Sequence, residues 1–205
     1  QVPIGAEERF QGVIDLLTME QIAWNDETLG AEYTAGPIED EFLELAEEYR
    51  DKLLEAVSEL DDDIMEKYLG EEDIPVDELR AAIRAATIRR DMVPVLCGSA
   101  LRNKGIQPLL DAIDHYLPSP KDVPPVKGEH PENNEILEFK PEKNGPLAGL
   151  IFKVSMIEGR KLSFARIYSG KIASGGDVFN PALKRKEKLS RILRMHANKR
   201  ERLDE

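Results

Sequence analysis

A proline-rich stretch divides this chain of 205 residues into two parts that differ in residue pattern and in charge. Residues 118–146 contain seven prolines and few large apolar side chains. Because proline restricts the backbone and removes an N–H donor, such a stretch excludes helix and is stiff. We expect residues 119–146 to be a semi-rigid linker between an α/β part and a β part.

The two parts carry opposite charge, although the net charge of the chain is −12. Residues 1–118 hold 28 acidic and 10 basic side chains, a formal charge of −18. Residues 147–205 hold 6 acidic and 14 basic side chains, a formal charge of +8. This asymmetry favours two modules with different partners, a basic surface for one and a polyanion for the other. The alternative is that the two parts attract each other.

The first part alternates short apolar runs with helical patterns. Residues 10–24 are typical of one or two strands, and residues 25–37 of a loop. Residues 61–69 predict a short helix, and Asp73 is expected to cap a further helix that ends near residue 87. Residues 38–60 predict a long amphipathic helix. Its apolar face comprises Ile38, Phe42, Leu45, Tyr49, Leu53, Ala56 and Leu60.

The opposite face of the long helix is strongly acidic. Glu48 and Lys52 are spaced for an i,i+4 ion pair, but most carboxylates on this face have no cation beside them. A binding surface for a basic partner and an ordinary solvated surface both fit the pattern. The candidate contacts are Glu41, Glu44, Glu48, Asp51 and Glu55.

Residues 92–118 are typical of the end of an α/β domain. The apolar run 92–97 predicts a strand of a covered parallel sheet, in which Cys97 is a small buried residue. Gly98, Ser99 and Ala100 then form a loop where open α/β sheets bind ligands, and small residues let N–H groups approach a planar base. An ordinary strand-to-helix turn is the alternative. A helix over 105–117 is expected to turn Ile106, Leu109, Leu110, Ile113 and Leu117 toward the sheet.

The second part reads as short strands separated by glycine-containing turns. Strands are predicted at 147–154, 162–168, 177–180 and 184–195, which is typical of part of a β-barrel. So few strands leave open edges, and we expect self-association through them. The basic side chains here suit phosphate neutralisation rather than base stacking, because few aromatics lie among them, although a plain solubilising edge is the alternative. They are Lys184, Arg185, Lys186, Lys188, Arg191, Arg194 and Lys199.

Several features are missing from the sequence. It has no Gly-x-x-x-x-Gly-Lys-Ser/Thr phosphate loop, and no Asn-Lys-x-Asp precedes residue 92. No leader follows Gln1 and no apolar run approaches membrane-spanning length, so we expect no signal peptide and no membrane partner. A single cysteine cannot form an internal disulfide, which suits the reducing cytoplasm.

Five segments, in order, resemble elongation factor G, the bacterial ribosomal translocase. PVLCGSALRNKGIQPLLDAIDHYLPSPKDVPP resembles the end of that family's GTPase domain. PIGAEERFQGVIDL and LAEEYRDKLLEAVSELDDDIMEKYLGEE resemble the insert in that domain, and FARIYSGKI and RILRMHAN resemble the second domain. The class II release-factor GTPase is the nearest rival, but NKGIQPLLDAI and YLPSP favour the translocase.

The resemblance implies the organisation of an internal fragment. The insert would occupy residues 1–91, the last strand and helix of a partial P-loop GTPase domain 92–118, the linker 119–146, and an incomplete β-barrel domain 147–205. The stretch MIEGR lacks the Asp-Pro-Phe usual in the family, and NPALKRKEK is also atypical, which indicates a divergent copy.

The resemblance also implies partners. Gly98, Ser99 and Ala100 would form the guanine loop, the acidic helix face would contact the ribosomal stalk protein, and the basic residues would contact small-subunit ribosomal RNA. GTP or GDP with magnesium would belong to a longer parent GTPase. We expect no catalytic residue, no metal ligand, no bound nucleotide and no GTP hydrolysis in these 205 residues. The rival interpretation is a stand-alone ribosome- or RNA-binding adaptor without nucleotide.

Overall fold

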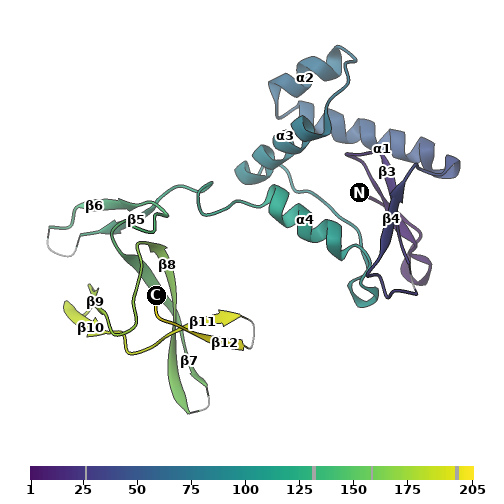
Figure 1. The fold of residues 1–205 in the computed structure, drawn as a ribbon. Helices are drawn as coiled ribbons and strands as arrows, with labels where there is room; N and C mark the ends of the chain where they lie inside the picture. The colour runs from purple at the N-terminus through teal and green to yellow at the C-terminus, as the bar shows by residue number, and fades with distance from the viewer. Residues whose placement is uncertain (26, 131–132, 158, 197–198) are drawn as a thin grey trace. The chain divides into compact units, whose positions relative to one another are not determined.

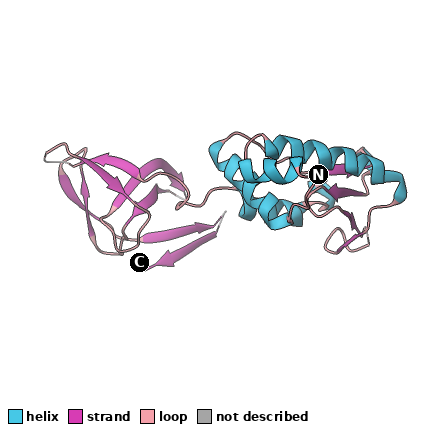
Figure 2. Cartoon of the chain, turned by 90° about the horizontal axis from the view of Figure 1, so that it is seen from above, coloured by secondary structure: helices cyan, strands magenta, loops and turns pink. Residues whose placement is uncertain are grey.

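The computed structural model describes residues 1–25, 27–130, 133–157, 159–196 and 199–205. The chain forms two compact units, Gln1–Pro118 and Ser119–Glu205 (Figure 1, Figure 2). Helices occur in the first unit, and the second is built of strands. Among the described residues, no helix is both long and apolar enough to cross a lipid bilayer.

The first unit begins with a four-stranded antiparallel sheet in the order β1-β2-β3-β4. Val13 and Ile14 are adjacent in β2 and both fully buried, so both faces of the sheet are covered. Ile14 packs with Ala46 of the following helix, and Val13 packs with Trp24. The strands are β1 (Val2–Ile4), β2 (Gly12–Asp15), β3 (Glu20–Trp24) and β4 (Tyr33–Gly36).

The strand β4 lies inside the segment that the sequence predicts to be a loop, so the loop prediction over 25–37 is wrong for its last third. Tyr33, Thr34 and Ala35 pair with Trp24, Ala23 and Ile22 of β3. All four residues of β4 are exposed or half-buried, so the strand shows no apolar alternation. It is defined by its main-chain hydrogen bonds alone.

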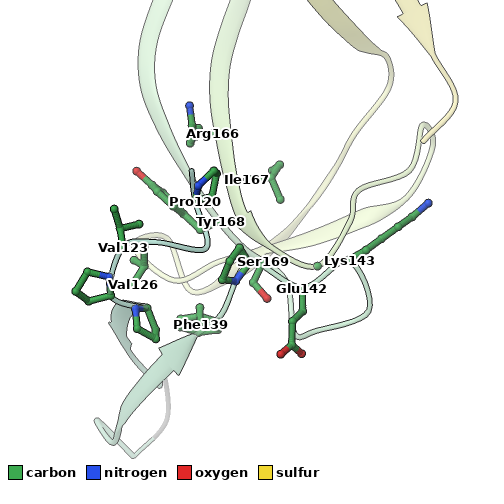
Figure 3. Close-up of a pocket in the computed structure, with 14 residues that line it drawn as sticks. Pro120, Val123, Val126, Phe139, Glu142, Lys143, Arg166, Ile167, Tyr168 and Ser169 are labelled. Carbon is green, nitrogen blue, oxygen red and sulfur yellow. The ribbon is translucent and has the colours of Figure 1, made fainter. Parts of the chain in front are cut away.

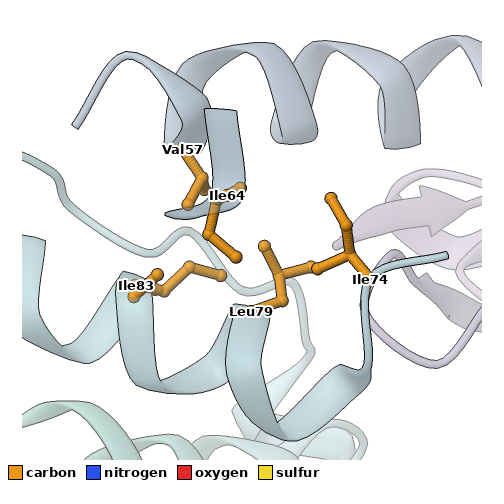
Figure 4. Packing of buried hydrophobic residues seen from close by; sticks show 6 residues of the cluster. Val57, Ile64, Ile74, Leu79 and Ile83 are labelled. Carbon is orange, nitrogen blue, oxygen red and sulfur yellow. The ribbon is translucent and has the colours of Figure 1, made fainter. Parts of the chain in front are cut away.

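Three helices follow, and their existence and order confirm the prediction: α1 (Asp40–Ser58), α2 (Asp62–Leu69) and α3 (Val76–Arg89). Val57, Ile64, Ile74, Leu79 and Ile83 from the three helices and the connection before α3 form one apolar cluster (Figure 4). The predicted cap is wrong, because α3 starts after Pro75 without any side-chain cap. A capping bond of the expected kind occurs one helix earlier, where Asp61 accepts a hydrogen bond from the Ile64 N–H at 3.1 Å.

The buried stripe of α1 differs from the predicted one. Ala46 and Val57 are fully buried, whereas Leu45 and Tyr49 are about 40% exposed. Arg50 lies in the buried stripe, and its Nη1 donates to the carbonyls of Leu16 and Leu17. Burial lowers the pKa of Arg50, and nearby carboxylates oppose that shift. A charged residue therefore occupies a core-facing position, which hides the true stripe from a hydrophobicity pattern.

The parallel-sheet strand predicted at 92–97 is not formed, and every strand pair described in the chain is antiparallel. Val93 and Val95 are 80% and 70% exposed. The next helix, α4 (Ile106–Tyr116), also exposes the face expected to cover that sheet, including Leu110 and Leu117. Among the described residues no strand pairs with 92–97, which leaves Val93 and Val95 exposed, whereas Met92 and the half-buried Cys97 pack beside buried clusters of the unit.

The second unit consists of four antiparallel strand pairs: β5 (Val126–Glu129) with β6 (Ile136–Phe139), β7 (Ala148–Ile157) with β8 (Arg160–Ser169), β9 (Asp177–Asn180) with β10 (Arg185–Lys188), and β11 (Ile192–His196) with β12 (Lys199–Leu203). The β5–β6 pair lies within the proline-rich stretch, where the sequence analysis expects no strand. The single strand expected over 184–195 is two strands, β10 and β11. The described strands join only in pairs, so the barrel stays a prediction.

Candidate functional site

The loop after residue 97 is closed by two main-chain hydrogen bonds. The Ser99 N–H donates to the Lys104 carbonyl at 2.9 Å, and the Lys104 N–H donates to the Ser99 carbonyl at 3.1 Å. Two glycines allow this closure. A Cβ on Gly98 would lie 2.8 Å from the Lys104 carbonyl oxygen. Gly105 has φ +82°, and a Cβ on it would lie 2.7 Å from the Cys97 carbonyl oxygen. Either substitution would force the loop apart.

The backbone donors of the predicted base-binding residues differ in availability. The Ser99 N–H is already used inside the loop. Ala100 is exposed and begins a short 3₁₀ helix, Ala100–Arg102, and none of the described residues accepts a hydrogen bond from its N–H. Gly98 is exposed and Ser99 half-buried. Within residues 98–100, the Ser99 N–H is therefore engaged, whereas the N–H groups of the exposed Gly98 and Ala100 have no acceptor among the described residues.

Lys104 is the loop's buried charged residue, 2% exposed, and its Nζ donates to the Phe10 carbonyl at 3.4 Å. Burying an ammonium group is costly unless it finds acceptors, so this contact attaches the loop firmly to the N-terminal sheet. The sequence analysis treats this lysine only as part of a family signature. A basic residue among small ones in a loop carries no pattern that indicates burial.

The five predicted acidic contacts all lie on the exposed surface of α1. Two of them already have partners. Glu48 forms an ion pair with Lys52, as the spacing predicts, and Asp51 accepts a hydrogen bond from the Tyr68 hydroxyl at 2.9 Å. This hydrogen bond raises the pKa of the Tyr68 phenol. Glu41, Glu44 and Glu55 are the other three exposed carboxylates of the predicted acidic surface on α1.

The seven predicted basic residues are all exposed but do not form one patch. They lie on the β9–β10 pair, on the connection after it, and on the β11–β12 pair, which Figure 1 shows as separate pairs. Arg185 and Lys186 are adjacent in β10 and therefore point to opposite faces. Arg185 also pairs with Glu187 at 3.2 Å, and Arg194 lies 3.8 Å from Glu201.

The sequence analysis omits Arg200 and Arg202, which β12 places beside Met195 and Leu193 of β11. The signal that indicates them is their position in the basic cluster at residues 199–202, which a single glutamate interrupts. With Arg194 and Lys199 they make β11–β12 the more basic of the two pairs.

Two pockets lie away from these predicted residues. One, of about 330 Å³, lies in the second unit between the proline-rich segment and the end of β8, and Val126, Phe139, Ile167 and Ser169 help to line it (Figure 3). The other, of about 560 Å³, lies between α2 and α3 and is lined mainly by carboxylates, including Asp63, Glu66 and Glu72. In the described part of the chain, no group of three His, Cys, Asp or Glu side chains is arranged to hold a metal ion.

Comparison with known proteins identifies the relationship. Over all 205 residues the chain is 48% identical to elongation factor G 2 from Syntrophus aciditrophicus (strain SB). The chain is homologous to part of elongation factor G. It spans 30% of the length of that relative. This finding confirms the family resemblance seen in the sequence.

The fold agrees with a solved structure. A crystal structure of a protein from Thermus thermophilus matches 99% of the chain with a TM-score of 0.72, at 22% sequence identity, and the match covers 27% of that protein. At this identity the match shows the fold alone. No protein-family model matches the chain. The elongation factor G relationship therefore rests on the sequence match over all 205 residues of this chain.

Proposed function

We propose that this chain supplies the base-facing loop and two ribosome-facing surfaces of a translational GTPase of the elongation factor G type. The observation that carries the proposal is the 48% identity over all 205 residues. The matched span contains the Gly98-Ser99-Ala100 loop. In the parent, GTP hydrolysis would drive movement of messenger and transfer RNA on the ribosome in the cytoplasm.

The loop's role would be recognition of guanine. A base with an exocyclic oxygen offers an acceptor for an N–H that has no partner inside the protein, and the Ala100 N–H has no acceptor among the described residues. Adenine carries an exocyclic amino group there and would not accept. The small side chains of residues 98–100 leave room for the edge of the ring.

Hydrolysis requires groups that this sequence does not contain. Positioning and neutralising the γ-phosphate needs a phosphate loop with its lysine and a magnesium ion. The 205 residues include no phosphate-loop motif. We therefore expect no magnesium-dependent GTP turnover by this chain alone, and saturable turnover would contradict that expectation.

The acidic face of α1 would bind the basic domain of the ribosomal stalk protein. Its five carboxylates are exposed on one helix, so the attraction depends on charge and is screened by salt. We expect binding to weaken as salt rises from about 0.05 to 0.5 M.

Charge reversal tests this surface. The triple change Glu44→Lys, Glu48→Lys and Asp51→Lys should weaken binding of the stalk protein's basic domain at least about tenfold, measured by calorimetry at low salt. The matched control reverses three exposed carboxylates on α2, on α3 and on the connection between them, Asp63→Lys, Glu72→Lys and Asp77→Lys, and changes net charge equally. Equal weakening by both triples, or none by the first, would reject α1 as the contact.

The basic residues would contact the phosphate backbone of small-subunit ribosomal RNA. They lie on two strand pairs, so they suit contacts with phosphates at separate places along an RNA surface rather than one base-reading cleft. Arg200 and Arg202 join the seven predicted residues in this role.

A segment exchange tests the proposed function as a whole. This chain would replace the homologous 205-residue part of elongation factor G 2 from S. aciditrophicus, and ribosome-stimulated GTP hydrolysis would be measured. We expect the hybrid to retain hydrolysis within about tenfold of the parent. A folded hybrid that binds ribosomes but shows no stimulated hydrolysis would instead favour an adaptor that acts without nucleotide.

A further inference from the structure

Six hydrogen bonds join residues 102–107 to residues 8–31, across 74 to 94 positions of sequence. In three of them a side chain of the loop donates to a main-chain carbonyl. Arg102 donates to Glu8 at 3.0 Å, Asn103 to Leu29 at 3.3 Å, and Lys104 to Phe10 at 3.4 Å. The accepting carbonyls lie outside the strands, in the segment between β1 and β2 and in the connection between β3 and β4.

Gln107 makes the other three contacts and uses both ends of its amide. Its Nε2 donates to the carbonyls of Gly30 at 3.0 Å and Ala31 at 3.4 Å, and its Oε1 accepts from the Trp24 indole N–H at 3.1 Å. The indole N–H can only donate, so it dictates which end of the amide faces Trp24. Trp24 is 6% exposed in the apolar cluster of the sheet, so this donor is held in place.

The main chains also touch where these contacts occur. Gly30 has φ +74°, and a Cβ there would lie 2.6 Å from the Asn103 carbonyl oxygen. Only glycine tolerates both the dihedral angle and the approach. The connection between β3 and β4 is therefore packed directly against the loop.

The chain on the two sides of the loop is supported differently. Before the loop, residues 92–97 form no strand ladder with any described residue, and Val95 is largely exposed. After the loop, Lys104 closes the Ser99–Lys104 bridge, and Gln107 lies in the first turn of α4. The contacts that hold the loop therefore come mostly from its carboxyl-terminal side.

We propose that Gln107 is a positioning residue for the loop at residues 98–100. Oriented by Trp24, its amide fixes the start of α4 on the β1–β4 sheet, and the sheet thereby sets the geometry of the loop. Whether this positioning of the loop contributes to guanine recognition rests on the proposed function. The positioning itself does not depend on nucleotide.

Two substitutions separate the two ends of the amide. Gln107→Met keeps the side chain's length and removes both donor and acceptor. Gln107→Glu keeps an acceptor for Trp24 and removes the donors to Gly30 and Ala31. The matched control is Gln11→Met, a glutamine with an exposed side chain in the same unit.

The measurement is amide hydrogen exchange by NMR on the whole chain without nucleotide. We expect Gln107→Met to speed exchange of the Ser99 and Lys104 amides about tenfold, since each is protected only while the loop stays closed. Amides of Leu79 and Ile83 in α3 should keep their rates, and Gln11→Met should leave the loop amides unchanged. The Trp24 indole N–H resonance should shift in Gln107→Met and stay near its original position in Gln107→Glu, whereas loop exchange should rise in both.

Two results would overturn the proposal. Unchanged exchange at Ser99 and Lys104 in both variants would show that Gln107 does not hold the loop. Equal acceleration in the loop and in α3 would show that Gln107 supports only the general stability of the unit. Neither the amide exchange nor the indole resonance requires nucleotide. Loss of ribosome-stimulated hydrolysis in the segment exchange would therefore not contradict the positioning role of Gln107. Unchanged amide exchange in the Gln107 variants would likewise not contradict the proposed function.

Discussion

Ser99 and Ala100 are adjacent in the loop, yet their backbone N–H groups have different fates. The Ser99 donor closes the loop on Lys104, and no described residue accepts a hydrogen bond from the Ala100 N–H. The sequence alone does not distinguish the Ser99 N–H from the Ala100 N–H, because a Gly-Ser-Ala tripeptide does not show which N–H will donate to a carbonyl inside the protein. That choice depends on Gly105, whose positive φ brings the Lys104 carbonyl back to Ser99.

Tyr68 gives a prediction at the same scale. Its hydroxyl donates to Asp51, which raises the pKa of the phenol above its usual value of 10.0. Asp51→Asn should lower the pKa of Tyr68 toward that value, because the negative acceptor is gone. Absorbance titration of phenolate would measure the change, with Tyr68→Phe identifying the group among the five tyrosines.

The sign of the linked stability follows from this direction. The hydrogen bond stabilises the fold while the phenol is protonated, so its contribution is complete below about pH 10 and is lost as pH rises through the raised pKa. An unchanged pKa of Tyr68 in Asp51→Asn would show that the bond is not formed in solution.

At the scale of elements, the three helices α1–α3 depend on one shared cluster. Leu79 is fully buried at its centre with Ile64 and Ile83 (Figure 4). Leu79→Ala should lower the free energy of unfolding by about 2–5 kcal/mol, because it removes buried apolar atoms and leaves a cavity. Chemical denaturation followed by circular dichroism would measure the loss.

The control for this prediction is Leu69→Ala at the end of α2. Leu69 is 74% exposed, so the change should stay within about 0.5 kcal/mol. Comparable losses from the two substitutions would show that the helices do not share the described core.

Elements with a strong local pattern were predictable, and those defined by distant partners were not. The helices show the 3.6-residue period over many residues, and β9 lies between clear glycine and proline signals. By contrast, β4 and β5 have no apolar alternation, and they exist because a neighbouring strand takes their hydrogen bonds. The stripe of α1 was misassigned because the half-buried Arg50 lies in line with Ala46 and Val57 and donates hydrogen bonds to carbonyls.

At the scale of the whole molecule, Val93, Val95 and Leu110 are largely exposed, and the chain spans 30% of the length of the related elongation factor G 2. Family motifs predicted the relationship, and no periodicity argument could have done so. The sites on the ribosome-facing surfaces stay predictions, since their meaning depends on partners.

We propose that Ala100 presents its N–H to guanine, and one substitution tests this contact directly. Ala100 is the first residue of its 3₁₀ helix and follows Ser99 in an extended conformation, so proline fits there and removes only the N–H. In the hybrid elongation factor, Ala100→Pro should weaken GDP binding about tenfold and abolish preference for GDP over its 2-aminopurine analogue, which lacks the exocyclic oxygen. Leu101→Ala, at a 98% exposed neighbour, should change neither. Unchanged GDP affinity and preference in Ala100→Pro would contradict the claim.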